Sequence, residues 1–151
     1  MARRTAFWIG AALAVAGLVP AGAAGLPQGT FAGTATWLGP DRSTGSYEVE
    51  KTISGNTVSA RYAWTDTGRR EESHSVTFDI EPARPTFDVL DARAEVVGSG
   101  FCLEDACSYR VTLGPVTIAE TMQWTADRMT VIGSKAGPGF AIVWKEQLDQ
   151  R

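Results

Sequence analysis

The stretch SYEVEKTISGNTVSARYAWT, residues 46–65, shows the alternation that sets the architecture of this chain. Apolar and polar residues alternate on both sides of a central Gly55-Asn56 pair. A period of two is typical of a half-buried β-strand, and Gly and Asn are turn residues. The stretch therefore predicts a β-hairpin with strands over 46–53 and 57–65. The apolar face of this hairpin is expected to carry Tyr47, Val49, Ile53, Val58, Ala60, Tyr62 and Trp64.

The rest of the chain repeats this pattern. Gly, Pro, Asp and Asn punctuate it at intervals of about 8–12 residues, the spacing of sandwiches and barrels. Short connections force antiparallel neighbours, and closing into a barrel removes exposed sheet edges. We therefore expect an all-β fold, a single antiparallel up-and-down β-barrel of about 8–10 strands. The further strands are expected over 31–38, 73–81, 86–90, 94–97, 101–103, 107–113, 116–125, 129–134 and 140–148.

The segment Phe-Ala-Gly-Thr-Ala-Thr-Trp at residues 31–37, the meander and the chain length resemble the calycins. This group holds the lipocalins, the fatty-acid-binding proteins and the avidins. The resemblance is one of shape over the whole mature chain, and it implies a calycin-like barrel. It transfers no functional residues: lipocalins usually place Gly and Trp two positions apart, whereas Gly33 and Trp37 are four apart.

The N-terminal residues are typical of a signal peptide. The pair Arg3-Arg4 precedes an apolar run over 6–19, and Ala21-Gly22-Ala23 matches an A-x-A cleavage site. Residues 1–23 are therefore predicted to be removed, which leaves one domain over 24–151. An uncleaved anchor is the alternative, although the run is short for a bilayer. We expect a bacterial periplasmic or secreted protein that does not contact the membrane after cleavage.

Cys102 and Cys107 are the two cysteines of the chain. In an oxidising compartment, two cysteines this close in sequence are most simply a disulfide. A thioredoxin-like reactive pair has two intervening residues, whereas four separate these cysteines. A metal site needs further ligands, and the chain has one histidine. The sequence therefore predicts a structural disulfide and no metal site.

Charge and motifs exclude several function classes. Lys and Arg number 14 against 17 Asp and Glu, without a basic cluster, so we expect no nucleic-acid partner. Nucleophile-elbow, zinc-protease, Walker A and dinucleotide motifs do not occur. We therefore expect no catalytic residues and no cofactor, and a protein that is not an enzyme. An enzyme would require His74 with Glu120 or an Asp as an acid–base pair.

Two polar residues fall in phase with apolar faces. His74 shares a face with Val76, Phe78 and Ile80 and is either a core histidine or a pocket residue. Glu120 shares a face with Ile118 and Met122, where a carboxylate is costly unless it is paired. Either a bulge turns Glu120 outward, or it pairs with a cation, for which the candidates are Arg110, Arg61 and His74. Glu146 raises the same question near a strand end, where water is expected to reach it.

The aromatic residues of the inward faces either fill the barrel or line a cavity, and both alternatives remain open. The expected function is an exported barrel that binds a small apolar or amphipathic ligand. The alternative is a protein-binding module, such as an inhibitor of an extracellular hydrolase, that contacts a secreted partner through the hairpin tip at 103–106. The candidate ligand-binding residues are Tyr62, Trp64, His74, Phe78, Tyr109, Glu120 and Trp124.

Overall fold

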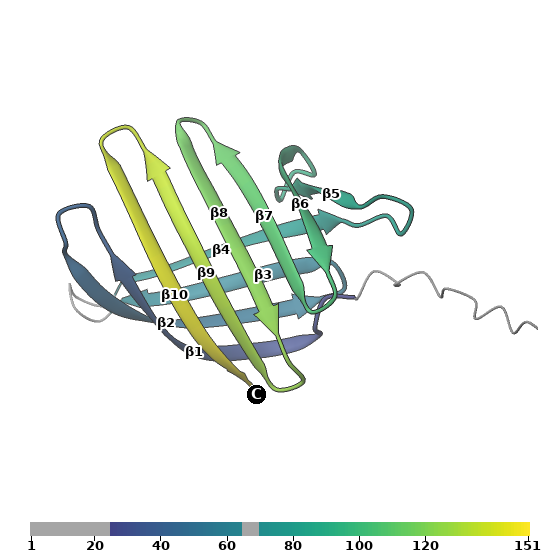
Figure 1. Ribbon diagram of the computed structural model, residues 1–151, viewed down its shortest axis with the longest axis horizontal. Helices are drawn as coiled ribbons and strands as arrows, with labels where there is room; N and C mark the ends of the chain where they lie inside the picture. Colours follow the sequence, from purple (N-terminus) through teal and green to yellow (C-terminus); the bar gives the residue numbers. More distant parts are fainter. Residues whose placement is uncertain (1–24, 65–69) are drawn as a thin grey trace, which may run out of the picture.

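The computed structural model describes residues 25–64 and 70–151, so the predicted signal peptide over 1–23 lies outside the described residues. Within the described ranges, ten antiparallel strands and no helix are found. Their order is β1-β10-β9-β8-β7-β6-β5-β4-β3-β2, which closes into an up-and-down barrel (Figure 1). The predicted fold class is confirmed. In this part of the chain, no helix is long and apolar enough to cross a membrane.

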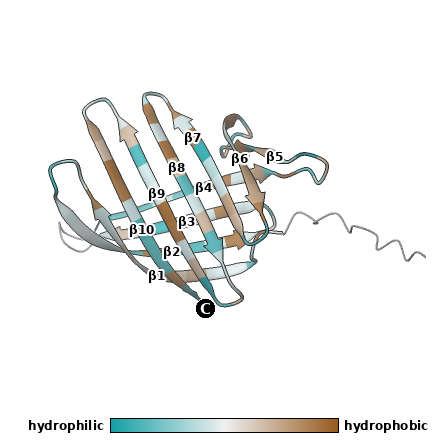
Figure 2. Cartoon of the chain, in the orientation of Figure 1, coloured by the Kyte–Doolittle hydropathy of each residue, from teal (hydrophilic) through white to brown (hydrophobic). Residues whose placement is uncertain are grey.

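The strands are β1 (Gly29–Leu38), β2 (Thr44–Ser54), β3 (Thr57–Trp64), β4 (Arg70–Asp79), β5 (Thr86–Leu90), β6 (Val96–Leu103), β7 (Ala106–Leu113), β8 (Val116–Trp124), β9 (Arg128–Gly137) and β10 (Phe140–Gln150). Figure 2 shows apolar and polar bands alternating along β8, β9 and β10. The hairpin predicted from residues 46–65 forms as β2 and β3. Ser54 pairs with Thr57 across a two-residue turn in which Gly55 has a φ of 59°.

The barrel closes where the first and last strands meet. β1 pairs with β10 from Phe31 opposite Gln150 to Leu38 opposite Val143. In Figure 1, β7 to β10 cross in front of β1 to β4 at a steep angle. Side chains from β2 therefore meet side chains from β8 and β10 inside the barrel, although these strands are far apart in sequence.

The segment Gly98-Ser99-Gly100 separates the strands expected over 94–97 and 101–103, but it lies within β6. The register is irregular one residue earlier: Val89 pairs with Gly98 but Leu90 pairs with Val96, so Val97 is skipped. Gly98 is required for strand approach, because an added Cβ would lie 1.9 Å from the carbonyl oxygen of Arg110 on β7. One strand with a register irregularity at Val97 therefore replaces the two strands expected over 94–97 and 101–103.

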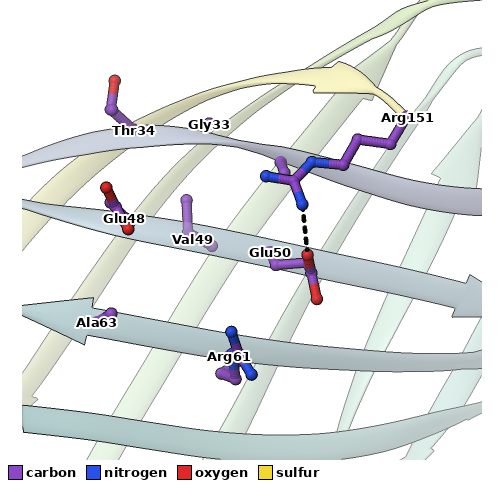
Figure 3. Close-up of a pocket in the computed structure, with 9 residues that line it drawn as sticks. Gly33, Thr34, Glu48, Val49, Glu50, Arg61, Ala63 and Arg151 are labelled. Carbon is purple, nitrogen blue, oxygen red and sulfur yellow. Dashed lines mark hydrogen bonds and ion pairs between the residues drawn. The ribbon is translucent and has the colours of Figure 1, made fainter.

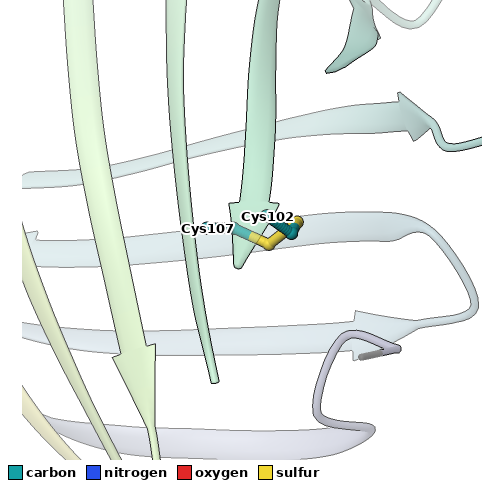
Figure 4. The surroundings of a disulfide bond; sticks show 2 residues. All are labelled: Cys102 and Cys107. Carbon is teal, nitrogen blue, oxygen red and sulfur yellow. A yellow bond between two sulfur atoms is a disulfide. The ribbon is translucent and has the colours of Figure 1, made fainter. Parts of the chain in front are cut away.

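The predicted disulfide is present between Cys102 and Cys107 (Figure 4). The two residues face each other across β6 and β7, just before the turn that joins Leu103 to Ala106. The bond therefore clips the end of this hairpin.

One end of the barrel interior is filled by apolar side chains. Leu26, 4% exposed, precedes β1 and packs into this core. The Gln28 side chain accepts a hydrogen bond from the Gly55 backbone N–H at 2.7 Å, which ties the segment to the β2–β3 turn. This end is called the closed end below. Its buried core includes Phe31, Phe78, Phe87, Met122, Met129, Val131 and Leu148.

Candidate functional site

The opposite end of the barrel contains a cavity of about 400 Å³, which is within the size range of small-ligand sites. It is called the open-end cavity. Both sequence alternatives are therefore partly realised, because side chains fill the closed end and the other end is hollow. The lining residues are Trp37, Tyr47, Tyr62, Trp64, Arg70, Glu72, His74, Ile118, Glu120, Lys135, Ile142 and Trp144.

Aromatic rings line this cavity, and cross-strand pairing places several of them side by side. Trp37 on β1 pairs with Trp144 on β10, and Tyr47 on β2 pairs with Trp64 on β3. The ring centroids of Tyr47 and Trp64 lie 5.4 Å apart, and those of Tyr47 and Tyr62 lie 5.6 Å apart. Such a wall can pack against a flat or aliphatic ligand.

Gly133 on β9 makes room for one of these rings. It pairs with Trp144, and a Cβ added to Gly133 would lie 2.2 Å from the indole ring. The absence of a side chain at this position therefore lets the indole lie directly over the strand.

We expect Gly133→Ala to displace the Trp144 indole and to lower the free energy of unfolding by about 1–3 kcal/mol. Urea titration measures this change. The matched control is Gly25→Ala, since a Cβ there meets nothing within 4 Å, and we expect it to change stability by less than about 0.5 kcal/mol. Equal effects of the two substitutions would contradict the packing role of Gly133.

Below the aromatic wall lies a buried charge cluster made of Lys51, Glu120 and Glu146. These three residues are 0%, 3% and 0% exposed, in that order. Lys51 Nζ donates to Glu120 Oε1 at 3.3 Å and Oε2 at 3.1 Å. The same Nζ lies 3.2 Å from Glu146 Oε2. One cation is therefore shared by two carboxylates.

Tyrosine hydroxyls complete the cluster. Tyr109 donates a short hydrogen bond to Glu120 Oε2, and Tyr47 donates to Glu146 Oε1 at 3.2 Å. Burial is the largest cause that raises the pKa of Tyr47, Tyr62 and Tyr109, so these hydroxyls stay protonated. Because a buried carboxylate must be paired or hydrogen-bonded, these donors stabilise the cluster.

The three charged groups respond differently to burial. Burial opposes the charge of Lys51 and Glu120 and is the largest single contribution for each. It is outweighed by the sum of the favourable contributions, which include Glu120 and Glu146 for Lys51, and Lys51 and the Tyr109 hydrogen bond for Glu120. The pKa of Lys51 is therefore raised and that of Glu120 lowered. For Glu146, burial and repulsion by Glu120 dominate, and its pKa is raised to about 7. At neutral pH, Lys51 and Glu120 are charged, whereas Glu146 lies close to its own pKa and is only partly ionised.

His74 lies at the rim of the open-end cavity. The residue as a whole is exposed, but its ring stacks on Tyr62 with centroids 5.3 Å apart. Its Nε2 is 3.4 Å from the Tyr62 hydroxyl. Desolvation of the ring is the largest cause that lowers the pKa of His74, so its imidazole is neutral at pH 7.

A second hollow lies on the outer surface, over β1, β2 and β3 (Figure 3). Charged side chains border it, including Glu48 and Arg61, and Arg151 forms an ion pair with Glu50 at 3.1 Å. It has no aromatic lining. Among residues 25–64 and 70–151, no group of three or more His, Cys, Asp or Glu side chains is placed to bind a metal ion.

The structure separates the residues that the sequence proposed for ligand binding. Tyr62, Trp64, His74 and Glu120 line the open-end cavity. The other three are buried and do not line it: Phe78 stacks on Phe87, Tyr109 contacts Glu120, and Trp124 lies toward the closed end.

Two expectations about the carboxylates need correction. The partner of Glu120 is Lys51, whereas Arg61 and Arg110 are exposed and His74 lies at the rim. Glu146 is fully buried in the cluster, not reached by water near a strand end. The sequence analysis did not identify Lys51 as a buried residue. Its alternation with Tyr47 and Val49 on β2, which places all three on the same face, could have indicated this.

Comparison with known proteins supports the fold. No protein-family model matches this chain, and no curated protein matches it in sequence. Among solved structures, it is similar to an S-type phycobiliprotein lyase from Guillardia theta, with a TM-score of 0.65 and 7% sequence identity. The match covers 82% of this chain and 88% of that chain. At this identity the likeness shows a shared lipocalin-like barrel.

Proposed function

We propose that this protein binds a small amphipathic ligand in the open-end cavity. The observation that carries the proposal is a cavity of about 400 Å³ with an aromatic wall and polar groups at its rim and floor. Ligand sites are typically concave and mostly apolar, with a few placed polar groups that orient the ligand. Of the residues proposed from the sequence, Tyr62, Trp64, His74 and Glu120 supply this lining.

Binding without turnover is the simpler function for this set of side chains. Lys51 and Glu120 neutralise each other in the charge cluster, and Tyr109 is engaged by Glu120. A general acid or base must instead reach a substrate with a proton to exchange. The phycobiliprotein lyase has the same barrel shape, which supports a ligand-binding scaffold and transfers no reaction to this chain.

The compartment belongs to the same proposal. A disulfide between Cys102 and Cys107 is compatible with an oxidising environment. Together with the signal peptide predicted over 1–23, it supports function in the periplasm or outside the cell.

Interaction with a secreted protein stays the alternative prediction. In its favour, Leu103 at the end of the disulfide-clipped hairpin is 69% exposed and the neighbouring Phe101 is 54% exposed. Ligand binding is preferred because the open-end cavity is a concave site lined by aromatic rings, whereas this tip is a small apolar surface.

The proposal is tested with the neutral fluorescent probe N-phenyl-1-naphthylamine, titrated into the full-length mature protein. We expect saturable binding, weakened by Trp64→Ala about tenfold because the substitution removes part of the aromatic wall. Phe101→Ala is the control, since Phe101 is exposed outside the cavity, and we expect it to leave the affinity unchanged. No saturable binding, or equal binding by the Trp64→Ala protein, would overturn the proposal.

A further inference from the structure

Lys135 stands among apolar neighbours on the wall of the open-end cavity. It follows Met129, Val131 and Gly133 in the inward parity of β9, and it is half-buried. In the ladders it pairs with Ile118 on β8 and with Ile142 on β10. All three residues line the cavity. The ammonium group is therefore carried on a stem that lies between two isoleucines.

Other charges of the cavity lining are already paired. Arg70 and Glu72 form an ion pair at the rim, and Arg70 also lies 5.0 Å from the Trp64 ring centre. Glu120 is neutralised by Lys51. Across residues 25–64 and 70–151, no ion pair or hydrogen bond is found for the Lys135 ammonium group.

The histidine at the rim does not supply a competing charge. The pKa of His74 is lowered, chiefly by burial of its ring, and Lys135 is among the charges that lower it further. With His74 neutral, Lys135 is the charged group of the cavity lining for which no counter-charge is found among residues 25–64 and 70–151. An ammonium group without a protein counter-charge is free to form a charge-assisted hydrogen bond with a bound anion.

We propose that the ligand of the open-end cavity is an amphipathic anion whose acidic group pairs with Lys135. This inference rests on the proposed function and adds the ligand's charge and orientation. Lys135 lies one inward row nearer the open end than Gly133, which pairs with Glu120. The acidic group therefore stays near the rim, away from the Glu120 carboxylate, and the apolar body packs against the aromatic wall.

Two probes that share one ring system test this inference. The sulfonate 1-anilinonaphthalene-8-sulfonate is titrated beside the neutral N-phenyl-1-naphthylamine at pH 7 and moderate salt. We expect the sulfonate to bind about tenfold more tightly than the neutral probe, and we expect Lys135→Met to bring the ratio of the two affinities close to one. The control is Lys145→Met, which deletes the same charge at an exposed position of β10 and should preserve the advantage.

The outcomes separate this inference from the function on which it rests. If the neutral probe fails to bind, the proposed function itself is wrong. If the neutral probe binds but the sulfonate shows no advantage, the inference about charge is wrong. An advantage that Lys135→Met and Lys145→Met reduce equally would also overturn it, because net charge and not a placed ammonium would then be responsible.

Discussion

Replacing Lys51 with methionine lowers the free energy of unfolding by about 3–5 kcal/mol at pH 7. The substitution removes the cation that Glu120 and Glu146 share and leaves two carboxylates in the barrel interior without it. An uncompensated buried charge is far more costly than the loss of the attraction itself, because water no longer solvates it. The remaining carboxylates then take up protons, so the loss is expected to be smaller at pH 5 than at pH 7.

Urea unfolding followed by circular dichroism measures this loss. Lys145→Met is the matched control, since Lys145 is exposed on the outer face of β10, and its effect should stay within about 0.5 kcal/mol. A Lys51→Met protein as stable as the Lys145→Met protein at pH 7 would contradict the shared-cation description.

A triple variant separates lost charge from lost packing. In Lys51→Met/Glu120→Gln/Glu146→Gln the cluster is neutral but keeps its approximate shape, and we expect it to recover much of the stability that Lys51→Met loses. This variant also keeps the prediction testable if Lys51→Met does not fold. Failure of the triple variant to recover stability would show that the Lys51 side chain matters for its packing and not for its charge.

Side-chain alternation was sufficient to predict the barrel and much of its interior. Within a strand, residues two apart share a face regardless of what the rest of the chain does. Tyr62 and Phe78 are buried, as their parity indicates. The disulfide was predictable for a similar reason, because Cys102 and Cys107 are close in sequence and need no long-range contact to meet.

The charge cluster was not predictable in the same way, because it depends on closure of the barrel. Lys51 and Glu120 are 69 residues apart on strands that are not neighbours. Side-chain alternation on β2 places Lys51 inward. Lysine is rarely buried without a partner, however, so its residue type favours an exposed position. Glu120 was recognised as costly on an apolar face, and its partner was sought among Arg61, Arg110 and His74.

The division of the interior into a filled end and a hollow end was equally beyond the sequence. Side-chain alternation predicts that Trp64 and Phe78 both face inward. It does not predict where along the barrel axis each of them lies. Height depends on strand tilt and register, which are fixed only when β1 pairs with β10. Phe78 consequently packs in the closed-end core, whereas Trp64 reaches the open-end cavity.

Ionisation of Glu146 is expected to lower the stability of the folded protein as the pH rises from about 5 to 8. Its pKa is about 7 in the folded protein against an ordinary value of 4.5. Between these values the folded protein retains a proton that the unfolded chain has released, so raising the pH favours unfolding. At about 1.4 kcal/mol per pKa unit, the full effect is about 3 kcal/mol.

Glu146→Gln isolates this contribution because the amide cannot ionise. The stability of the variant relative to the wild type should grow as the pH rises from 5 to 8. This difference removes the opposing contribution of His74, whose pKa is lowered in both proteins. Glu120 does not obscure the result: its pKa is lowered below 4.5, so the stability it provides is lost only as the pH falls below that value. Urea unfolding at pH 5, 6, 7 and 8 gives both profiles, and parallel profiles would show that Glu146 is ionised throughout this range.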